Sequence, residues 1–263
     1  MSKRNNFFGS KSGLTARTIA FLAATGITDT TITNALNTMD LALIANGLDT
    51  KMQALYPFVG GTATTHKFNF MNPADTDAAF RIVWSGGITH SATGVLFNGS
   101  TGFGDTNINA STDLTLNDDH VSISCITDID GAYFDMGCGN GNSNRIIMAA
   151  RLGNIHYSDH YEFTTTRVTY ANTNRIGYYI DTRTTGSLLS CYKGGVLKGS
   201  SSALDGSSPA NRNIYIGGWN NNGSLAHPTP AGYNFCTAGS GLTSTDASNL
   251  STIEANFQIN LGR

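Results

Sequence analysis

Charged residues are scarce in this sequence of 263 residues. They make up 13% of the chain, against 40% hydrophobic residues, which is about half the charged share of an average globular protein. The formal net charge is −2. We therefore expect no broad basic face and no nucleic-acid partner, because phosphate backbones are bound through clustered lysine and arginine.

Long apolar runs are also missing. No stretch of about 18 consecutive apolar residues occurs, so we expect no membrane insertion. The N-terminal segment "MSKRNNFFGSKSG" is basic but lacks the apolar core of a signal peptide. This favours synthesis in a cytoplasm and reduced thiols for the four cysteines. Two disulfides are the alternative if the protein is exported.

Glycine, asparagine, threonine and serine are abundant in place of charged residues. This composition favours an all-β protein with many turns. From about residue 62 apolar residues alternate with polar ones, and "LLSCYKGGVLKG" is typical of a hairpin turning at Gly194-Gly195. The absence of βαβ spacing excludes a doubly wound fold and leaves a sandwich or jelly roll. The alternating segments predict strands in "THKFNFMN", "AFRIVWS", "HVSISCIT", "RIIMAARLG", "RIGYYIDT" and "RNIYIGGW".

The stretch "GVLFNGSTGFGDT", residues 94–106, allows three interpretations: a glycosylation acceptor at Asn98, a glycine-rich phosphate loop, or a turn between two strands. The phosphate loop fails because no Gly-Lys-Ser/Thr follows and no helix is predicted after it. The acceptor matters only in an exported protein. We therefore predict strand, turn, strand, with the glycines supplying backbone freedom.

Helical periodicity occurs near both ends of the chain. Asp29 or Thr30 can cap a helix whose apolar face packs on its own domain or on copies of itself, and Asp49 can cap a second, short helix through Leu55. Thr243 can cap a C-terminal helix, with Asp246 completing a capping box. The expected organisation is an extended arm (1–20), a helical attachment or oligomerisation segment (21–61) and a β-sandwich with a C-terminal helix (62–263).

Four of these segments occur in an order that resembles laminin-G-like, concanavalin-A-like domains. They are "GVLFNGSTGFGDT" followed by "HVSISCIT", the hairpin "SLLSCYKGGVLKGSSSA", the strand "RNIYIGGWNNNG" and the helix start "GLTSTDASNL". The resemblance covers about residues 65 to 255. It implies a mainly β, jelly-roll sandwich, and calcium is the cofactor that relatives of this fold bind, through carboxylate, amide and carbonyl oxygens.

A second resemblance is to phage-encoded versions of this domain. The segment from "TGITDTTITNALNTMDLALIANGLDT" to "DAAFRIVW" is similar to the one that precedes the sandwich in phage virion proteins, and "FQINLGR" is similar to their ending. This implies a non-enzymatic structural protein on the virion surface, a decoration, fibre or spike module with other virion proteins as partners and a homotrimer as its expected state. We expect the assembly anchor in the N-terminal arm, at Lys3, Arg4, Phe7, Phe8 and Arg17.

Catalysis and metal binding find little support in the sequence. Retaining glycosidases need two carboxyl groups about 5 Å apart, and the chain has only two glutamates, Glu162 and Glu254. Asp128 and Asp130 in "TDIDGAYFD" are the weak candidates for a hydrolytic pair or for calcium. We therefore expect no enzyme, and a polysaccharide depolymerase is the weakest of three hypotheses.

Two further segments carry polar groups that could bind a ligand. In "NIHYSDHYE", His156 and His160 would lie about 13 Å apart on a strand, too far for one ion, so we expect exposed turn residues. In "GGWNNNG" and "PTPAGYNF", Trp219, Asn220, Asn221 and Tyr233 could stack on and hydrogen-bond a sugar. The main alternative to a purely structural virion protein is therefore a lectin-like module that binds host surface glycans.

Overall fold

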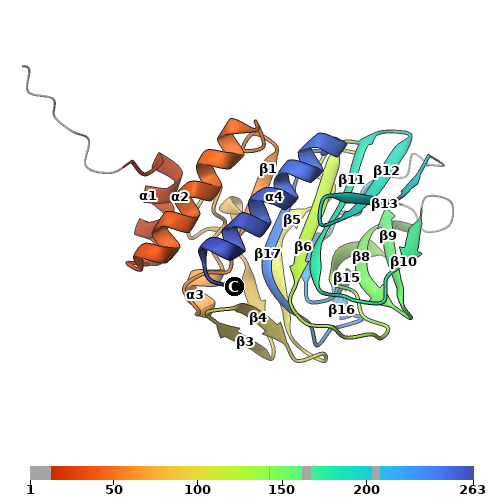
Figure 1. Ribbon diagram of the computed structural model, residues 1–263. Helices are drawn as coiled ribbons and strands as arrows, with labels where there is room; N and C mark the ends of the chain where they lie inside the picture. Colours follow the sequence, from red (N-terminus) through yellow and green to blue (C-terminus); the bar gives the residue numbers. More distant parts are fainter. Residues whose placement is uncertain (1–12, 142, 162–166, 203–207) are drawn as a thin grey trace, which may run out of the picture.

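The computed structural model describes residues 13–141, 143–161, 167–202 and 208–263. Within these residues the strands form two sheets that pack face to face, and helices cover the outer face of one sheet (Figure 1). The predicted jelly-roll sandwich with helices near both ends is confirmed. Among the described residues, no helix has the length and apolar character needed to cross a membrane.

The helix-covered sheet has β6 and β17 near its centre, and β1 pairs with β17 beside this path. In spatial order its strands are β13 (Val196–Ser201), β12 (Leu188–Lys193), β11 (Gly177–Thr185), β6 (Asp119–Cys125), β17 (Gly232–Gly239), β4 (Gly94–Phe97) and β3 (Ile88–Ser91), with β1 (Met52–Tyr56) added.

The second sheet faces the first across the main core, and a small hairpin, β15–β16, extends it beside β7. In spatial order its strands are β10 (Val168–Ala171), β9 (Ile155–His160), β8 (Ser143–Leu152), β7 (Met136–Asn140), β14 (Asn213–Ile216), β5 (Phe103–Asn109) and β2 (Val83–Ser85), followed by the hairpin strands β15 (Trp219–Asn221) and β16 (Ser224–Ala226).

Strand β6 shows how the alternating pattern builds two layers. Val121, Ile123 and Cys125 point into the core between the sheets, as the period of two requires. Ser122 points the other way, where its hydroxyl lies 2.7 Å from the Tyr178 hydroxyl. Every residue of β6 is buried, because the helices cover the outer face of this sheet (Figure 1).

The helices are α1 (Ala16–Thr25), α2 (Thr30–Ala45), α3 (Ala63–His66) and α4 (Ser244–Asn260), with a short 3₁₀ turn η1 (Asp77–Ala79). The predicted caps are confirmed: Asp29 accepts a hydrogen bond from the Ile32 amide, and Thr243 and Asp246 form a capping box. Apolar faces of α2 and α4 share one core with the outer face of the sheet. The helical segment therefore packs on its own domain.

The predicted organisation is wrong at three places near the N-terminus. An extended arm is expected through residue 20, but α1 begins at Ala16, capped by Thr15. The short helix expected from Asp49 is instead strand β1, which pairs with β17, so the sandwich begins before residue 62. The strand expected in "THKFNFMN" does not form, because its first two residues end helix α3 and the rest is irregular. There the Asn69 side chain accepts the Leu55 amide of β1.

Two predicted turns and the thiols agree with the structure. Gly194 and Gly195 turn the β12–β13 hairpin with φ angles of +56° and +76°, the region in which glycine is favoured. Between β4 and β5, Asn98 Oδ1 accepts the amides of residues 100, 101 and 102, each at 3.0 Å. All four cysteines are buried free thiols, as expected for a reduced protein.

A buried carboxylate ties the two sheets together. Asp135, just before β7, forms an ion pair with Arg175 and accepts a hydrogen bond from the Tyr233 hydroxyl of β17. Its other oxygen accepts the Ala150 amide of β8 at 2.6 Å. Both charged side chains are fully buried. The Asp135 carboxylate therefore connects β17 of one sheet with β8 of the other.

We predict that Asp135→Asn lowers the free energy of unfolding by about 3–5 kcal/mol, because Arg175 would keep its charge in the core without a counter-ion. The control is Asp75→Asn. Asp75 is half exposed and pairs with Lys67 and Arg81, so its loss should cost no more than about 1 kcal/mol. Urea unfolding of the three proteins checks this; equal losses in the two variants would contradict it.

Candidate functional site

The aromatic residues expected to hold a sugar are packed inside the protein. Tyr233 is 0% exposed and its hydroxyl is bound to Asp135. Trp219 is 5% exposed and packs against Phe134 in a small core on the outer face of the second sheet. Neither ring has a free face for stacking on a sugar. The prediction of a glycan site at these two residues is wrong, because both rings are used in packing.

The two asparagines beside Trp219 hold the β15–β16 hairpin. Asn220 donates to the Asn213 carbonyl at 2.8 Å and accepts the Gly223 amide at 2.9 Å. Asn221 accepts the Gly141 amide at 3.0 Å. These side chains satisfy backbone groups of neighbouring strands and turns. The two asparagines therefore have a structural role in this hairpin. The side-chain atoms that were expected to bind a sugar bind the protein backbone instead.

Asp128 and Asp130 are close together but already occupied. Arg151 donates to Asp128 at 2.7 Å and lies 3.6 Å from Asp130. Asp128 also accepts the Arg175 amide, and Asp130 accepts the amides of residues 153 and 154. The pKa of Asp128 is lowered, first by the amide hydrogen bond and also by Arg151. Asp128 Oδ1 and both oxygens of Asp130 are therefore already bound by a cation or by backbone amides, and calcium at these two carboxylates stays a prediction.

The expected assembly anchor is only partly within the described residues. Lys3, Arg4, Phe7 and Phe8 lie outside them. Arg17 lies in α1, where it forms ion pairs with Asp40 of α2 and, at 3.3 Å, with Asp49. Arg17 therefore joins the two N-terminal helices to each other, which differs from the predicted role in an extended arm.

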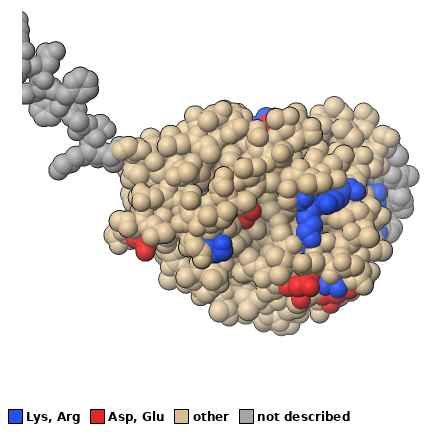
Figure 2. Space-filling view, viewed as in Figure 1, with Lys and Arg blue, Asp and Glu red and all other residues tan. Residues whose placement is uncertain are grey.

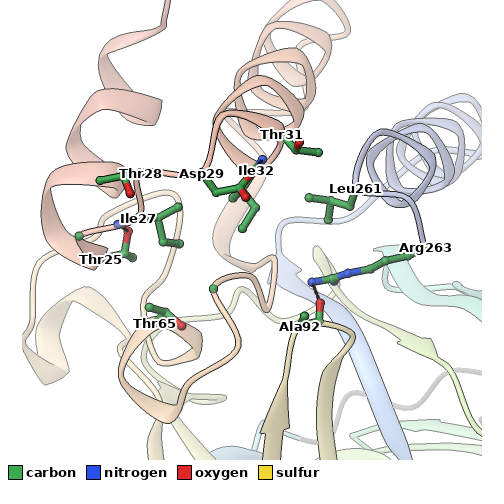
Figure 3. Close-up of a pocket in the computed structure, with 12 residues that line it drawn as sticks. Thr25, Ile27, Thr28, Asp29, Thr31, Ile32, Thr65, Ala92, Leu261 and Arg263 are labelled. Atoms are coloured by element: carbon green, nitrogen blue, oxygen red, sulfur yellow. Dashed lines mark hydrogen bonds between the residues drawn. The ribbon is translucent and has the colours of Figure 1, made fainter.

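A pocket lies where the N-terminal helices meet the end of α4. Its volume is about 610 Å³, within the range of sites for small ligands. Figure 3 shows its walls converging from four parts of the chain. They are the α1–α2 turn with the first turn of α2 (residues 25–29, 31 and 32), Gly60 with Thr65, Ala92, and Leu261 with Arg263.

Local backbone chemistry gives the pocket its shape. Asp29 caps α2 and so fixes the turn that carries Ile27 and Thr28. Gly60 has a φ of +86°, and a Cβ there would lie 2.8 Å from Thr65 Oγ1. Only glycine allows this close approach of the loop after β1 to the first turn of α3. The pocket wall therefore depends on a helix cap and a glycine. Both residues can be read from the sequence, but the sequence does not show that they lie next to each other in the fold.

Arg263 supplies the charge at the pocket. Its side chain donates to the Phe58 carbonyl at 3.2 Å and to the Ala92 carbonyl, as Figure 3 shows for the latter. Its Nη1 atom is buried and has no hydrogen-bond partner among the described residues. Burial lowers the pKa of Arg263 to about 10, so the guanidinium is still charged at neutral pH. A ligand oxygen could accept a hydrogen bond from such a nitrogen.

The rest of the pocket lining contains both hydroxyl groups and apolar side chains. Hydroxyls come from Thr25, Thr28, Thr31 and Thr65, and apolar surface comes from Ile27, Ile32, Ala92 and Leu261. The surrounding face, seen in Figure 2, carries few charged side chains. Such a lining suits a neutral or weakly anionic ligand that has both hydroxyl groups and apolar C–H surface.

A smaller hollow of about 320 Å³ lies beside Trp84. Trp84 is only half-buried, and its indole N–H donates to the Ala63 carbonyl at 3.1 Å. Lys67 and Arg81 flank it, but both form ion pairs with Asp75. The alternating pattern places Trp84 on the apolar face of a strand and gives no sign of its exposure, which depends on how the neighbouring α3 packs.

His66, the last residue of α3, holds the loop that lines the pocket. Its Nε2 accepts the Gly61 amide at 3.2 Å, and its Nδ1 lies 3.1 Å from Nδ1 of His90. Burial, together with the nearby His90 and Arg263, lowers the pKa of His66 to about 3. The neutral ring is therefore the form that supports the loop.

The comparisons agree on the fold. No protein-family model matches this sequence, and no curated protein matches it either. A structure of botulinum neurotoxin type C superposes with a TM-score of 0.56 at 10% identity, over 79% of this chain and 52% of that chain. The botulinum neurotoxin serotype D binding domain gives 0.55 at 10% identity over the same shares.

A third similar structure is domain 4 of AbnA, an extracellular arabinanase from Geobacillus stearothermophilus, in complex with arabinotriose. It has a TM-score of 0.48 at 13% identity, over 76% of this chain and 98% of that domain. This chain spans about half of the two toxin chains. At these identities the likeness to the toxin chains establishes a shared jelly-roll sandwich, and the ligand has to be argued from the pocket.

We predict that the protein loses stability as the pH falls below about 6.5, the pKa of an unfolded histidine. The unfolded chain binds protons there, whereas folded His66 binds one only near pH 3 and folded His120 only near pH 4. Stability is therefore fully present above pH 6.5 and falls toward pH 3. Urea midpoints of wild type and His66→Gln between pH 7.5 and about 4 check this. The variant should show the shallower loss, and identical slopes would contradict the assignment.

Proposed function

We propose that this protein is a lectin-like carbohydrate-binding module and that the pocket between the α1–α2 turn and the end of α4 holds the sugar. The observation that carries the proposal is the pocket itself. It is large enough for a mono- or disaccharide, at about 610 Å³. Its walls combine four threonine hydroxyls, short aliphatic side chains and one guanidinium.

The chemistry of a sugar matches this lining. Pyranose rings present hydroxyls, which exchange hydrogen bonds with threonine side chains, and C–H faces, which bury against aliphatic groups such as Ile27 and Ile32. Arg263 Nη1 would gain an acceptor from a ring hydroxyl or from a sugar carboxylate, and a charged donor gives the stronger bond. A saccharide would thus satisfy a buried donor that the protein leaves open among its described residues.

The fold supports this proposal without determining it. Cell entry of botulinum neurotoxin type C, whose structure superposes on this one, depends on interaction with two ganglioside molecules. The shared half of that chain is a jelly roll like this one, so a sugar-binding role is compatible with the architecture. The proposal for this chain depends on its own pocket.

Binding without cleavage is part of the proposal. A retaining glycosidase places two carboxyl groups about 5 Å apart at the scissile bond. Asp29 is the acidic residue in the pocket lining, and one of its oxygens caps α2. Asp128, Asp130 and Asp135 are held by arginines elsewhere. We therefore propose a module that binds its glycan unchanged.

The virion setting stays a proposal from the sequence resemblance. In it, the module projects from a phage particle as a homotrimer, attached through the N-terminal region. Since residues 16–25 form α1 and Arg17 pairs within the domain, a deletion of residues 1–12 tests attachment without disturbing the helices. Normal incorporation of this truncated chain into particles would reject the anchor, and light scattering of the free protein reports the trimer.

We predict that Thr31→Trp abolishes sugar binding while Thr30→Trp does not. Both residues are exposed in the first turn of α2, but only Thr31 lines the pocket. An indole at Thr31 would fill the space of a sugar ring. A glycan array of bacterial surface polysaccharides, followed by titration of the best ligand, should show at least about a tenfold loss for Thr31→Trp alone.

The matched pair makes the outcome specific. Because both variants add the same exposed ring to the same helical turn, a common effect on folding cancels between them. Unchanged affinity in both variants would place the ligand elsewhere, for example in the hollow beside Trp84, and overturn the pocket assignment. No binding of the wild type to any array component would reject the lectin function.

A further inference from the structure

Three ligand-type side chains meet between the sheets. They belong to β9, β11 and β12, which lie on the far side of the ribbon from α1 and α2 (Figure 1). His156 comes from β9 of the second sheet, and Asp181 and Cys191 come from β11 and β12 of the first. One nitrogen, one carboxylate oxygen and one sulfur from these residues all lie within 4.8 Å of one another. All three residues are 0% exposed.

Strand pairing fixes this meeting. Asp181 and Cys191 are direct partners across β11 and β12, so both side chains point to the same side of the sheet. The His156 ring is held between two tyrosine rings, with Tyr170 at 4.6 Å and Tyr179 at 5.5 Å between centroids, and both are close to parallel with it. This stacking fixes the orientation of the imidazole so that its edge faces Asp181. The distance from His156 Nε2 to Asp181 Oδ1 is 3.2 Å.

The cluster contains several polar atoms without partners. His156 Nδ1 and the Tyr170 hydroxyl are buried and have no hydrogen-bond partner among the described residues. Asp181 Oδ2 and Ser158 Oγ have no well-formed hydrogen bond there either, although both side chains interact with the Cys191 thiol. Ser158 lies two residues from His156 on the same face of β9, and Tyr170 stacks on His156. A buried polar group without a hydrogen-bond partner is unfavourable, so such a concentration indicates that something else binds there.

We propose that His156, Asp181 and Cys191 form a structural zinc site that joins the two sheets, with a neighbouring hydroxyl as the fourth ligand. The donor set of one nitrogen, one oxygen and one sulfur is typical of zinc. Zinc bonds of about 2.0–2.3 Å in a tetrahedron separate ligand atoms by about 3.3–3.8 Å. The ligand atoms, which all lie within 4.8 Å of one another, would have to approach by up to about 1 Å to reach this geometry.

Charge balance favours the ion. Zinc carries two positive charges, and the Asp181 carboxylate and a Cys191 thiolate carry two negative ones, so the occupied site is neutral and is tolerated in a dry core. Binding breaks the S–H bond of Cys191, forms the zinc–sulfur bond and releases the proton to solvent.

The sequence pattern around His156 points away from a metal site. It offers His156 and His160 as partners, which are too far apart on a strand for one ion, and it predicts exposed turn residues. In the structure both lie buried in β9. His160 Nδ1 pairs instead with Asp119 at 2.7 Å, while the ligands that match His156 are 25 and 35 residues away and belong to the other sheet.

The experiment measures the metal in the full chain. Protein expressed with zinc in the medium and dialysed against chelator should contain about one zinc per chain by mass spectrometry. The same protein, unfolded and refolded with Co²⁺, should show a thiolate-to-cobalt charge-transfer band. Cys191→Ala should lose both signals. Cys236→Ala is the matched control, since it removes an equally buried free thiol from another strand of the same sheet.

Each result decides the proposal. Zinc and the cobalt band in wild type and in Cys236→Ala, with neither in Cys191→Ala or Asp181→Asn, support it. Wild-type protein with less than about 0.1 zinc per chain and no cobalt band overturns it, and this needs no variant to fold. Equal zinc in Cys191→Ala and wild type also overturns it, because the ion would then be bound elsewhere.

Discussion

The buried pair of Asp135 and Arg175 is the contact on which the arrangement of the two sheets depends. A carboxylate and a guanidinium removed from water attract each other strongly but lose hydration, and such a pair is maintained only when further hydrogen bonds satisfy its remaining atoms. Here Tyr233 and the Ala150 amide satisfy the carboxylate, and Arg175 Nη2 also donates to Thr229, whereas Nε and Nη1 of Arg175 have no partner among the described residues. The pair therefore draws a tyrosine from one sheet and a backbone amide from the other to the same point. Removing any partner leaves the others unsatisfied in the core.

This constraint explains why the most suggestive surface residues of the sequence are not at the surface. A Trp or Tyr at a strand end can either pack or project, and its neighbours in sequence are the same in both cases. Tyr233 packs because its hydroxyl binds Asp135. Trp219 packs because β15 pairs with β7 and its ring lies against Phe134 on the outer face of the second sheet. The asparagines that were expected to bind a sugar form hydrogen bonds with backbone groups next to the β15–β16 hairpin. Sequence patterns record residue type, whereas exposure depends on long-range contacts.

The parts of the fold that were predicted correctly are those that local chemistry determines. The caps at Asp29 and Thr243, the glycine pair at the β12–β13 turn and the alternation in β6 all act within a few residues. The errors lie where contacts between residues far apart in the sequence determine the structure. Residues 52–56 form strand β1 because β17 pairs with them. In the same way, the pocket joins the α1–α2 turn, Gly60 with Thr65, Ala92, and Leu261 with Arg263, and the proposed metal site joins three strands. No spacing in the sequence could have indicated either.

The N-terminal helices have a larger role than that of an appendage. They share a core with the outer face of the helix-covered sheet, and the turn between them forms one wall of the pocket. A ligand in that pocket would touch this turn, the loop after β1 and the end of α4 together. It would therefore bind only the docked helices and stabilise them by its own binding free energy. Any partner that holds the N-terminal region would then be linked thermodynamically to ligand binding, although neither touches the other.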